Sequence, residues 1–142
     1  MKILVLLLLF STQVNASDTV NVWKSPTCGC CNDWIKYLKK NNFKVIEHNT
    51  GNYKIRKELG IDKKLSSCHT AIINEYVIEG HVPVKDIRRL LIEKPENIIG
   101  LSVPGMPIGS PGMDNKLYGE KEPFDVLIIE KDGLSSQIYS NN

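Results

Sequence analysis

The stretch VNVWKSPTCGCCNDWIKYLKK, residues 20–40, decides how this chain folds. Its first residues form a short strand-like run, which breaks at Ser25-Pro26-Thr27. Beyond the break, apolar side chains recur one helical turn apart, at Cys31, Ile35 and Leu38. Lysines occupy the other faces of this segment, and two asparagines end it. The stretch therefore predicts a strand, a turn that carries cysteines, and a helix whose N-terminus holds them.

The segments that follow alternate between strand and helix patterns. They are a strand at 43–47, a helix at 53–59, a β-hairpin of 70–73 and 76–79, a helix between Pro83 and Pro95, a loop at 101–119 and a closing hairpin at 124–139. A strand that leads through a cysteine-rich turn into a helix, with a hairpin and another helix later, is the arrangement of a thioredoxin-like domain. We expect an α/β fold with a thioredoxin-like mixed sheet, flanking helices, a Pro/Gly/Met-rich loop and a C-terminal β-hairpin.

The first sixteen residues have the pattern of a secretory signal peptide. Lys2 precedes an apolar run at 3–10, and small residues stand before the expected cleavage after Ala16. The apolar run is too short to span a bilayer, and no later stretch offers about twenty apolar residues. We therefore expect an exported protein whose mature domain, residues 17–142, has no membrane span.

The charge of the chain argues against nucleic acid as a partner. The formal net charge is +2, and loss of Lys2 with the signal lowers it to +1. Nucleic-acid-binding domains usually carry a much larger basic excess, gathered in a patch or stripe. A mature chain of this size also buries enough surface to fold without disulfides. Its four cysteines are therefore available for chemistry.

Cys28 and Cys31 form a C-x-x-C pair with a third thiol, Cys30, between them. Unpaired backbone N–H groups and the helix dipole stabilise thiolates at a helix N-terminus. Three thiolates within four residues repel one another, so ionising all of them requires a positive charge close by. A soft metal ion supplies that charge, and in a thioredoxin-like layout Cys68 enters the hairpin beside the same helix end. We predict one soft-metal site made of these four cysteines.

Disulfides are the competing interpretation. Cys28 and Cys31 can close across one helical turn, whereas adjacent cysteines bridge only in a strained ring. Cys68 could then pair with the remaining thiol, Cys30, which would give a scaffold with two bridges. A thioredoxin reductant usually has a cis-proline where this chain has Cys68, and its absence weakens the case for plain thiol–disulfide exchange.

Several other side chains are candidate ligands. His69 could be a ligand, a hydrogen-bond partner of a ligand, or an ordinary hairpin residue, and His81 is open to the same readings. His48 follows a strand with no cysteine nearby, which makes it a weaker candidate. Met106 and Met113 lie in the Gly/Pro-rich loop, where they either fill a gap against the core or offer the thioether donors that suit Cu(I).

These motifs together resemble the CopG-type periplasmic metal-binding family. The resemblance rests on SPTCGCC (25–31) with Trp34, SCHTA (67–71), EGHVP (79–83), GL (100–101), VPGMP (103–107) and GSPGM (109–113). It implies a thioredoxin-like fold, export to the periplasm and a role in copper handling and resistance. It also implies Cys28, Cys30, Cys31 and Cys68 as thiolate ligands, with His81, Met106 and Met113 as accessory groups.

The sequence leaves three functional hypotheses. In the first, the reduced protein holds Cu(I), with the possibility of a polynuclear cluster and redox activity, and other periplasmic copper-handling proteins are its partners. In this reading, metal occupancy and a Cys28–Cys31 disulfide exclude each other. The second is a periplasmic thiol-disulfide oxidoreductase in which Cys28 attacks and Cys31 resolves. The third is a structural scaffold with two permanent bridges.

Overall fold

The structure, a computed structural model, describes residues 18–135 and 137–142. The expected signal peptide, residues 1–16, lies outside the described residues. The helices are α1 (Gly29–Lys40), α2 (Tyr53–Glu58) and α3 (Val84–Glu93), with short 3₁₀ turns η1 (Lys63–Leu65) and η2 (Lys116–Tyr118). The strands are β1 (Thr19–Lys24), β2 (Lys44–His48), β3 (His69–Ile73), β4 (Tyr76–Glu79), β5 (Ile98–Ser102), β6 (Asp125–Glu130) and β7 (Ile138–Asn141).

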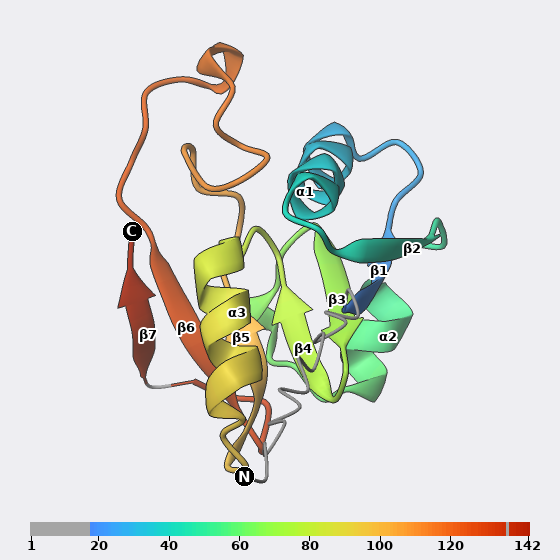
Figure 1. Ribbon diagram of the computed structural model, residues 1–142, viewed down its shortest axis with the longest axis vertical. Coiled ribbons are helices and arrows are strands. Elements are labelled where there is room, and N and C mark those ends of the chain that lie inside the picture. Colours follow the sequence, from blue (N-terminus) through green and yellow to red (C-terminus); the bar gives the residue numbers. More distant parts are fainter. Residues whose placement is uncertain (1–17, 136) are drawn as a thin grey trace, which may run out of the picture.

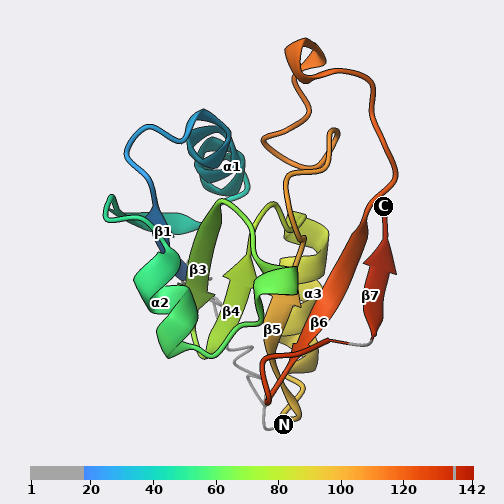
Figure 2. The ribbon, with the colours of Figure 1, turned by 180° about the vertical axis from the view of Figure 1, so that it is seen from behind.

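All seven strands belong to one mixed sheet in the order β2-β1-β3-β4-β5-β6-β7. The pairs β1–β2 and β4–β5 are parallel, because the crossover helices α1 and α3 connect them, and the other pairs are antiparallel. Helices α1 and α3 lie on the face turned toward the viewer in Figure 1, and α2 covers the opposite face in Figure 2. The first four strands with their three helices form the expected thioredoxin-like unit, which the last three strands extend.

The core between the sheet and the two helices on its front face is apolar. Trp34 and Leu38 of α1 and Leu90 of α3 are fully buried against strands β1, β3 and β4. Two polar contacts tie α1 to the start of α3: the Trp34 indole N–H donates to the Val82 carbonyl, and the Val84 N–H donates to the Tyr37 hydroxyl. These contacts fix the direction of α1, and with it the position of the cysteine-bearing N-terminus.

The main correction to the expected elements concerns β5. The sequence prediction assigned no strand to residues 98–100 and started a long loop at Leu101, whereas the structure has an inner strand at Ile98–Ser102. Gly100 obscured this strand because glycine is usually a loop signal. Here it lies against the backbone of Val77, where a Cβ atom would overlap the Val77 carbonyl.

Smaller differences occur toward the end of the chain. The 3₁₀ turn η1 was not predicted, and the loop after β5 contains the second one, η2. The closing hairpin forms as expected, but its second strand begins at Ile138 and not at 134.

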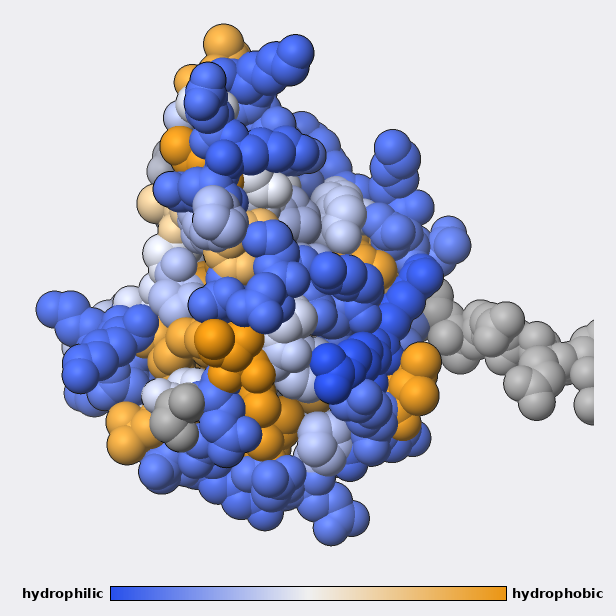
Figure 3. Space-filling model, turned by 90° about the vertical axis from the view of Figure 1, so that its left-hand side faces the viewer, coloured by the Kyte–Doolittle hydropathy of each residue, from blue (hydrophilic) through white to orange (hydrophobic). Residues whose placement is uncertain are grey.

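The surface of the molecule is mixed in polarity. Figure 3 shows apolar side chains gathered on the side of the molecule where β7 forms the sheet edge. Within the described residues, no helix has the length and apolar character that crossing a membrane requires.

The position of Gly100 gives a test of the fold. Gly100→Ala should lower the free energy of unfolding by at least about 2 kcal/mol, because the added methyl group forces β5 away from β4. Urea denaturation measures this loss. Gly29→Ala is the matched control, since a Cβ there meets no atom within 4 Å, and its stability should stay at the wild-type level or rise. Equal stability of both variants would contradict the close approach of the two strands.

Candidate metal centre

The N-terminus of α1 organises the first three cysteines. Cys28 is the N-cap residue, and its sulfur accepts a hydrogen bond from the Cys31 N–H at 3.3 Å. Cys28 and Cys31 form a disulfide with a Cα–Cα distance of 5.3 Å. Cys31 is fully buried, whereas Cys28 is half-buried. The expectation that this pair can close across one helical turn is confirmed.

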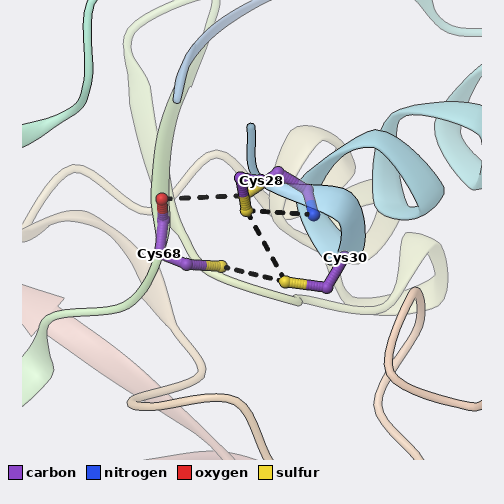
Figure 4. Close-up of side chains that lie close together, drawn as sticks. Cys28, Cys30 and Cys68 are labelled. Carbon is purple, nitrogen blue, oxygen red and sulfur yellow. Dashed lines mark hydrogen bonds between the residues drawn. A yellow bond between two sulfur atoms is a disulfide. The ribbon is translucent and has the colours of Figure 1, made fainter. Parts of the chain in front are cut away.

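Cys68 lies with these three cysteines, as the sequence predicted. Its sulfur is 3.8 Å from that of Cys30, which is 3.6 Å from the sulfur of Cys28 (Figure 4). The four sulfur atoms all lie within 4.8 Å of one another. Cys30 and Cys68 are free thiols, so the scaffold with two bridges is not what the structure contains. The antiparallel pairing of β1 with β3 causes this convergence, because it sets the start of β3 beside the end of β1.

The surroundings of Cys68 favour the protonated thiol. Burial raises the pKa of Cys68 to about 12, and the charge of Cys30 acts in the same direction, while a hydrogen bond from Ser67 acts against them. A cation that binds here must therefore displace the proton from the Cys68 thiol. Zn²⁺ and copper ions do this readily because the thiolate–metal bond replaces the lost S–H bond.

His81 has the orientation of a metal ligand. Its Nε2 atom is 3.1 Å from the Cys68 sulfur, and its Nδ1–H donates to the Pro111 carbonyl at 2.8 Å. A backbone carbonyl on the far nitrogen is the usual partner of a ligating histidine, since it fixes the tautomer and the ring orientation. Burial lowers the pKa of His81, which favours the neutral imidazole, whose Nε2 lone pair faces the Cys68 thiol.

His69 is buried beside the same sulfur in a less clearly ligand-like environment. Its Nδ1 atom lies 3.3 Å from the Cys68 sulfur, and its Nε2 atom has no hydrogen-bond partner among the residues that the structure describes. The ring packs against Trp34 and against the edge of His81, at centroid distances of 4.4 and 4.9 Å. Burial, followed by the charge of His81, holds the pKa of His69 well below its usual range. His69 therefore completes a second possible donor set, with Cys68 and His81.

The loop after β5 brings one methionine to the cluster. Figure 1 shows this loop rising beside α1. The Met106 sulfur is 3.8 Å from the Cys30 sulfur, and the side chain is half-exposed. Met113 is buried, and its backbone closes a turn with Gly109 and Ser110. Among the described residues, its sulfur makes none of the thiol contacts that Met106 makes.

Gly112 lets this loop close over the helix. A Cβ on Gly112 would lie 2.7 Å from the backbone nitrogen of Trp34 and 2.9 Å from the Cys30 carbonyl oxygen. Only glycine therefore allows this close approach.

The third histidine, His48, lies away from the cluster. It stacks on Trp23 at 4.4 Å and pairs with Asn21.

A polar network that the sequence analysis missed holds the Cys68 segment. Glu79 is fully buried, and its carboxylate accepts hydrogen bonds from the Ser67 N–H at 2.7 Å and the Thr70 hydroxyl at 2.5 Å. Arg56 lies 3.5 Å from the same carboxylate. Burial raises the pKa of Glu79 to about 7, against the effect of these three partners. Its sequence signal is a lone acidic residue at the end of an otherwise apolar strand, Tyr76–Glu79.

Comparison with known proteins identifies relatives of the chain. A family model described as "Protein of unknown function, DUF411" matches residues 65–113. Two solved structures, "Copper resistance protein copG" in form 1 and form 2, are each 34% identical to the chain. Each covers 89% of this chain, and the matches extend over 98% and 99% of those proteins, with TM-scores of 0.79 and 0.80. No curated protein matches the chain.

The geometry predicts unequal thiol reactivity. In unreduced, metal-free protein, iodoacetamide should modify Cys30 and Cys68 and leave the bridged pair intact. Cys30 should react first, because the raised pKa of Cys68 leaves less thiolate there. Peptide mapping by mass spectrometry over a time course measures both rates. A faster reaction at Cys68, or a dominant Cys30–Cys68 bridge, would contradict this arrangement.

Proposed function

The chain belongs to the CopG family of copper-resistance proteins, and on that premise we propose that it is an exported copper-binding protein that holds Cu(I) through its clustered cysteine thiolates. The observation that carries the proposal is the convergence of four sulfur atoms within 4.8 Å at one helix end. Copper resistance in the related proteins agrees with this donor set.

Cu(I) suits these donors better than the other common metal ions do. Thiolate and thioether sulfur are soft ligands that select Cu(I), whereas Zn²⁺ makes little use of thioether. Met106 adds a thioether beside Cys30, and His81 adds a neutral imidazole beside Cys68. With four thiolates in so small a space, sulfur bridges can hold more than one Cu(I), since each added ion offsets part of the negative charge.

The disulfide connects copper binding to the redox state. While Cys28 and Cys31 are bridged, two of the four thiolates are lost to a metal. Reduction restores them, so the proposed copper site and the disulfide exclude each other. In an oxidising compartment such a site would empty as the bridge closes and fill after the bridge is reduced.

We place this activity in the periplasm. The apolar N-terminal segment, with small residues before the expected cleavage after Ala16, is the basis for export, and the copper-resistance names of the relatives agree with it. The partners we propose are the copper ion and other periplasmic copper-handling proteins. The exposed half of Met106 is the part of the donor set that such a protein reaches first.

A thiol-disulfide oxidoreductase is the second candidate function. The observation in its favour is the bridged Cys28–Cys31 pair, in which the more exposed cysteine is the helix N-cap and the other is buried. This is the usual arrangement of an attacking and a resolving cysteine. Reduction of a model disulfide at an undiminished rate after complete metal removal would favour this function over copper binding.

Cysteine variants test the shared site. In an anaerobic titration of the fully reduced protein, Cys28→Ser and Cys68→Ser should each weaken Cu(I) binding by more than about 100-fold, since loss of even an outer-shell partner commonly costs about 10- to 100-fold. Competition with a chromogenic Cu(I) chelator gives the affinities. If neither variant binds copper more weakly than wild type, the shared-site proposal is wrong.

The accessory ligands can be separated in matched pairs. His81→Ala should weaken Cu(I) binding by about tenfold, whereas His48→Ala, distant from the sulfur atoms, should not. Met106→Leu should likewise weaken binding, by removing the thioether beside Cys30. Met113→Leu, measured in the same chelator competition, decides whether the buried methionine is also a ligand. Equal affinities for His81→Ala and His48→Ala would remove His81 from the proposed donor set.

A further inference from the structure

Ser67 joins the two segments that carry Cys68 and Met106. It directly precedes Cys68 in the chain, and it forms an isolated parallel bridge with Gly105, which directly precedes Met106. The Ser67 hydroxyl donates to the Gly105 carbonyl, and the Gly105 N–H donates to the Ser66 carbonyl at 3.0 Å. The distance between the two donor segments therefore depends on where Ser67 sits.

Three separate parts of the fold hold Ser67 in place. Its N–H donates to the buried Glu79 carboxylate at the end of β4. Its carbonyl accepts hydrogen bonds from Arg56 of α2 and from Asn52, which precedes that helix, both at 3.2 Å. With the hydroxyl bonded to Gly105, the backbone and side-chain polar groups of Ser67 all have partners. The Glu79 and Thr70 side chains of this network are buried, and a network in which every polar group has a partner favours a single arrangement of the groups it connects.

Glu79 is the centre of this network. A carboxylate with no solvent exposure is costly to bury, and an apolar residue would fill the same volume at less cost. Its partners are Ser67, Thr70 and Arg56, which flank or hold the Cys68 segment. The next residue, Gly80, has a φ of +74°, and a Cβ there would lie 2.5 Å from both the Ser67 hydroxyl and the Val103 carbonyl. Glu79 thus binds the Ser67 backbone, and the missing side chain of Gly80 leaves the space that the Ser67 hydroxyl occupies.

We propose that Glu79 is the positioning residue of the metal centre: through Ser67 it fixes the Cys68 and Met106 sulfurs at one spacing around Cys30. This inference rests on the proposed copper site, and it adds a function for residues that touch no metal. Glu79 orients Ser67 by its hydrogen bond, and Ser67 carries that orientation into both sulfur-bearing segments. The Cys30–Cys68 and Cys30–Met106 distances, both 3.8 Å, are the result.

The experiment has one arm without copper and one with it. In reduced, metal-free protein, the methyl resonance of Met106 should move toward its random-coil shift in Ser67→Ala and in Glu79→Leu. Glu79→Gln keeps an acceptor for the Ser67 N–H and should restore most of the wild-type shift. Tyr76→Phe is the matched control, because the hydroxyl of the buried Tyr76 also donates to a backbone carbonyl, that of Pro95, at the opposite end of β4 from Glu79.

In the second arm, Ser67→Ala should weaken Cu(I) binding by about tenfold, the range typical of outer-shell partners, while Tyr76→Phe should not. A double-mutant cycle adds a readout that mere destabilisation does not move. If Ser67 positions both sulfur atoms, Ser67→Ala should weaken Cu(I) binding less in the Met106→Leu background than in wild type, because only its effect on Cys68 remains.

The two arms separate failure of this inference from failure of the proposed function. An unchanged Met106 resonance in both Ser67→Ala and Glu79→Leu, or a fully additive double-mutant cycle, overturns the positioning role. Absence of Cu(I) binding by the reduced wild-type protein overturns the proposed function, and the metal-free arm then still decides whether Glu79 positions Met106. Thermal unfolding of each variant identifies any that fails to fold, in which case Glu79→Gln and Ser67→Ala decide the result.

Discussion

The structure depends on bringing four thiols to one helix end. Thiolates so close together repel one another, and their charge can be relieved by protonation, by a disulfide or by a cation. All three are represented in the proposed site. Cys68 has its pKa raised to about 12, Cys28 and Cys31 are bridged, and the four sulfur atoms lie within 4.8 Å of one another, where we propose that a soft metal ion binds. The same constraint thus connects protonation, redox state and metal binding.

The sheet topology creates this convergence from distant parts of the chain. Because β1 and β3 are antiparallel, with Lys24 paired to His69, the end of one strand lies beside the start of the other. The turn after β1 leads into α1 and carries Cys28, while the residue before β3 is Cys68. The parallel crossover through α3 then places the loop after β5 at the same end of the sheet, and with it Met106. The three segments that carry the sulfur atoms therefore meet at one end of the strands, as a consequence of strand direction.

Sequence patterns predicted the elements that this topology needs, but not all of their contacts. The helical period after Cys28 and the hairpin pattern after Cys68 were enough to predict that the four cysteines lie together. They could not reveal β5, because Gly100 is a loop signal in a sequence and a close-packing device in the sheet. Spacing also could not distinguish Met106 from Met113, since both lie in the same Gly/Pro-rich loop and only the path of that loop separates them. The Glu79–Ser67 contact joins residues of different elements and had no periodic signal.

The placement of the buried carboxylate bears on metal selectivity. A free carboxylate next to four sulfurs would add a hard donor and invite ions such as Mg²⁺ or Ca²⁺, which prefer oxygen. Glu79 lies close to the site, yet its oxygens already accept from Ser67 and Thr70 and face Arg56. Its hydrogen bonds therefore do two things at once: they hold the sulfur-bearing segments and they occupy the oxygen atoms. What remains for the proposed metal ion is sulfur and imidazole, so the hydrogen bonds of Glu79 agree with the preference for a soft ion that we propose.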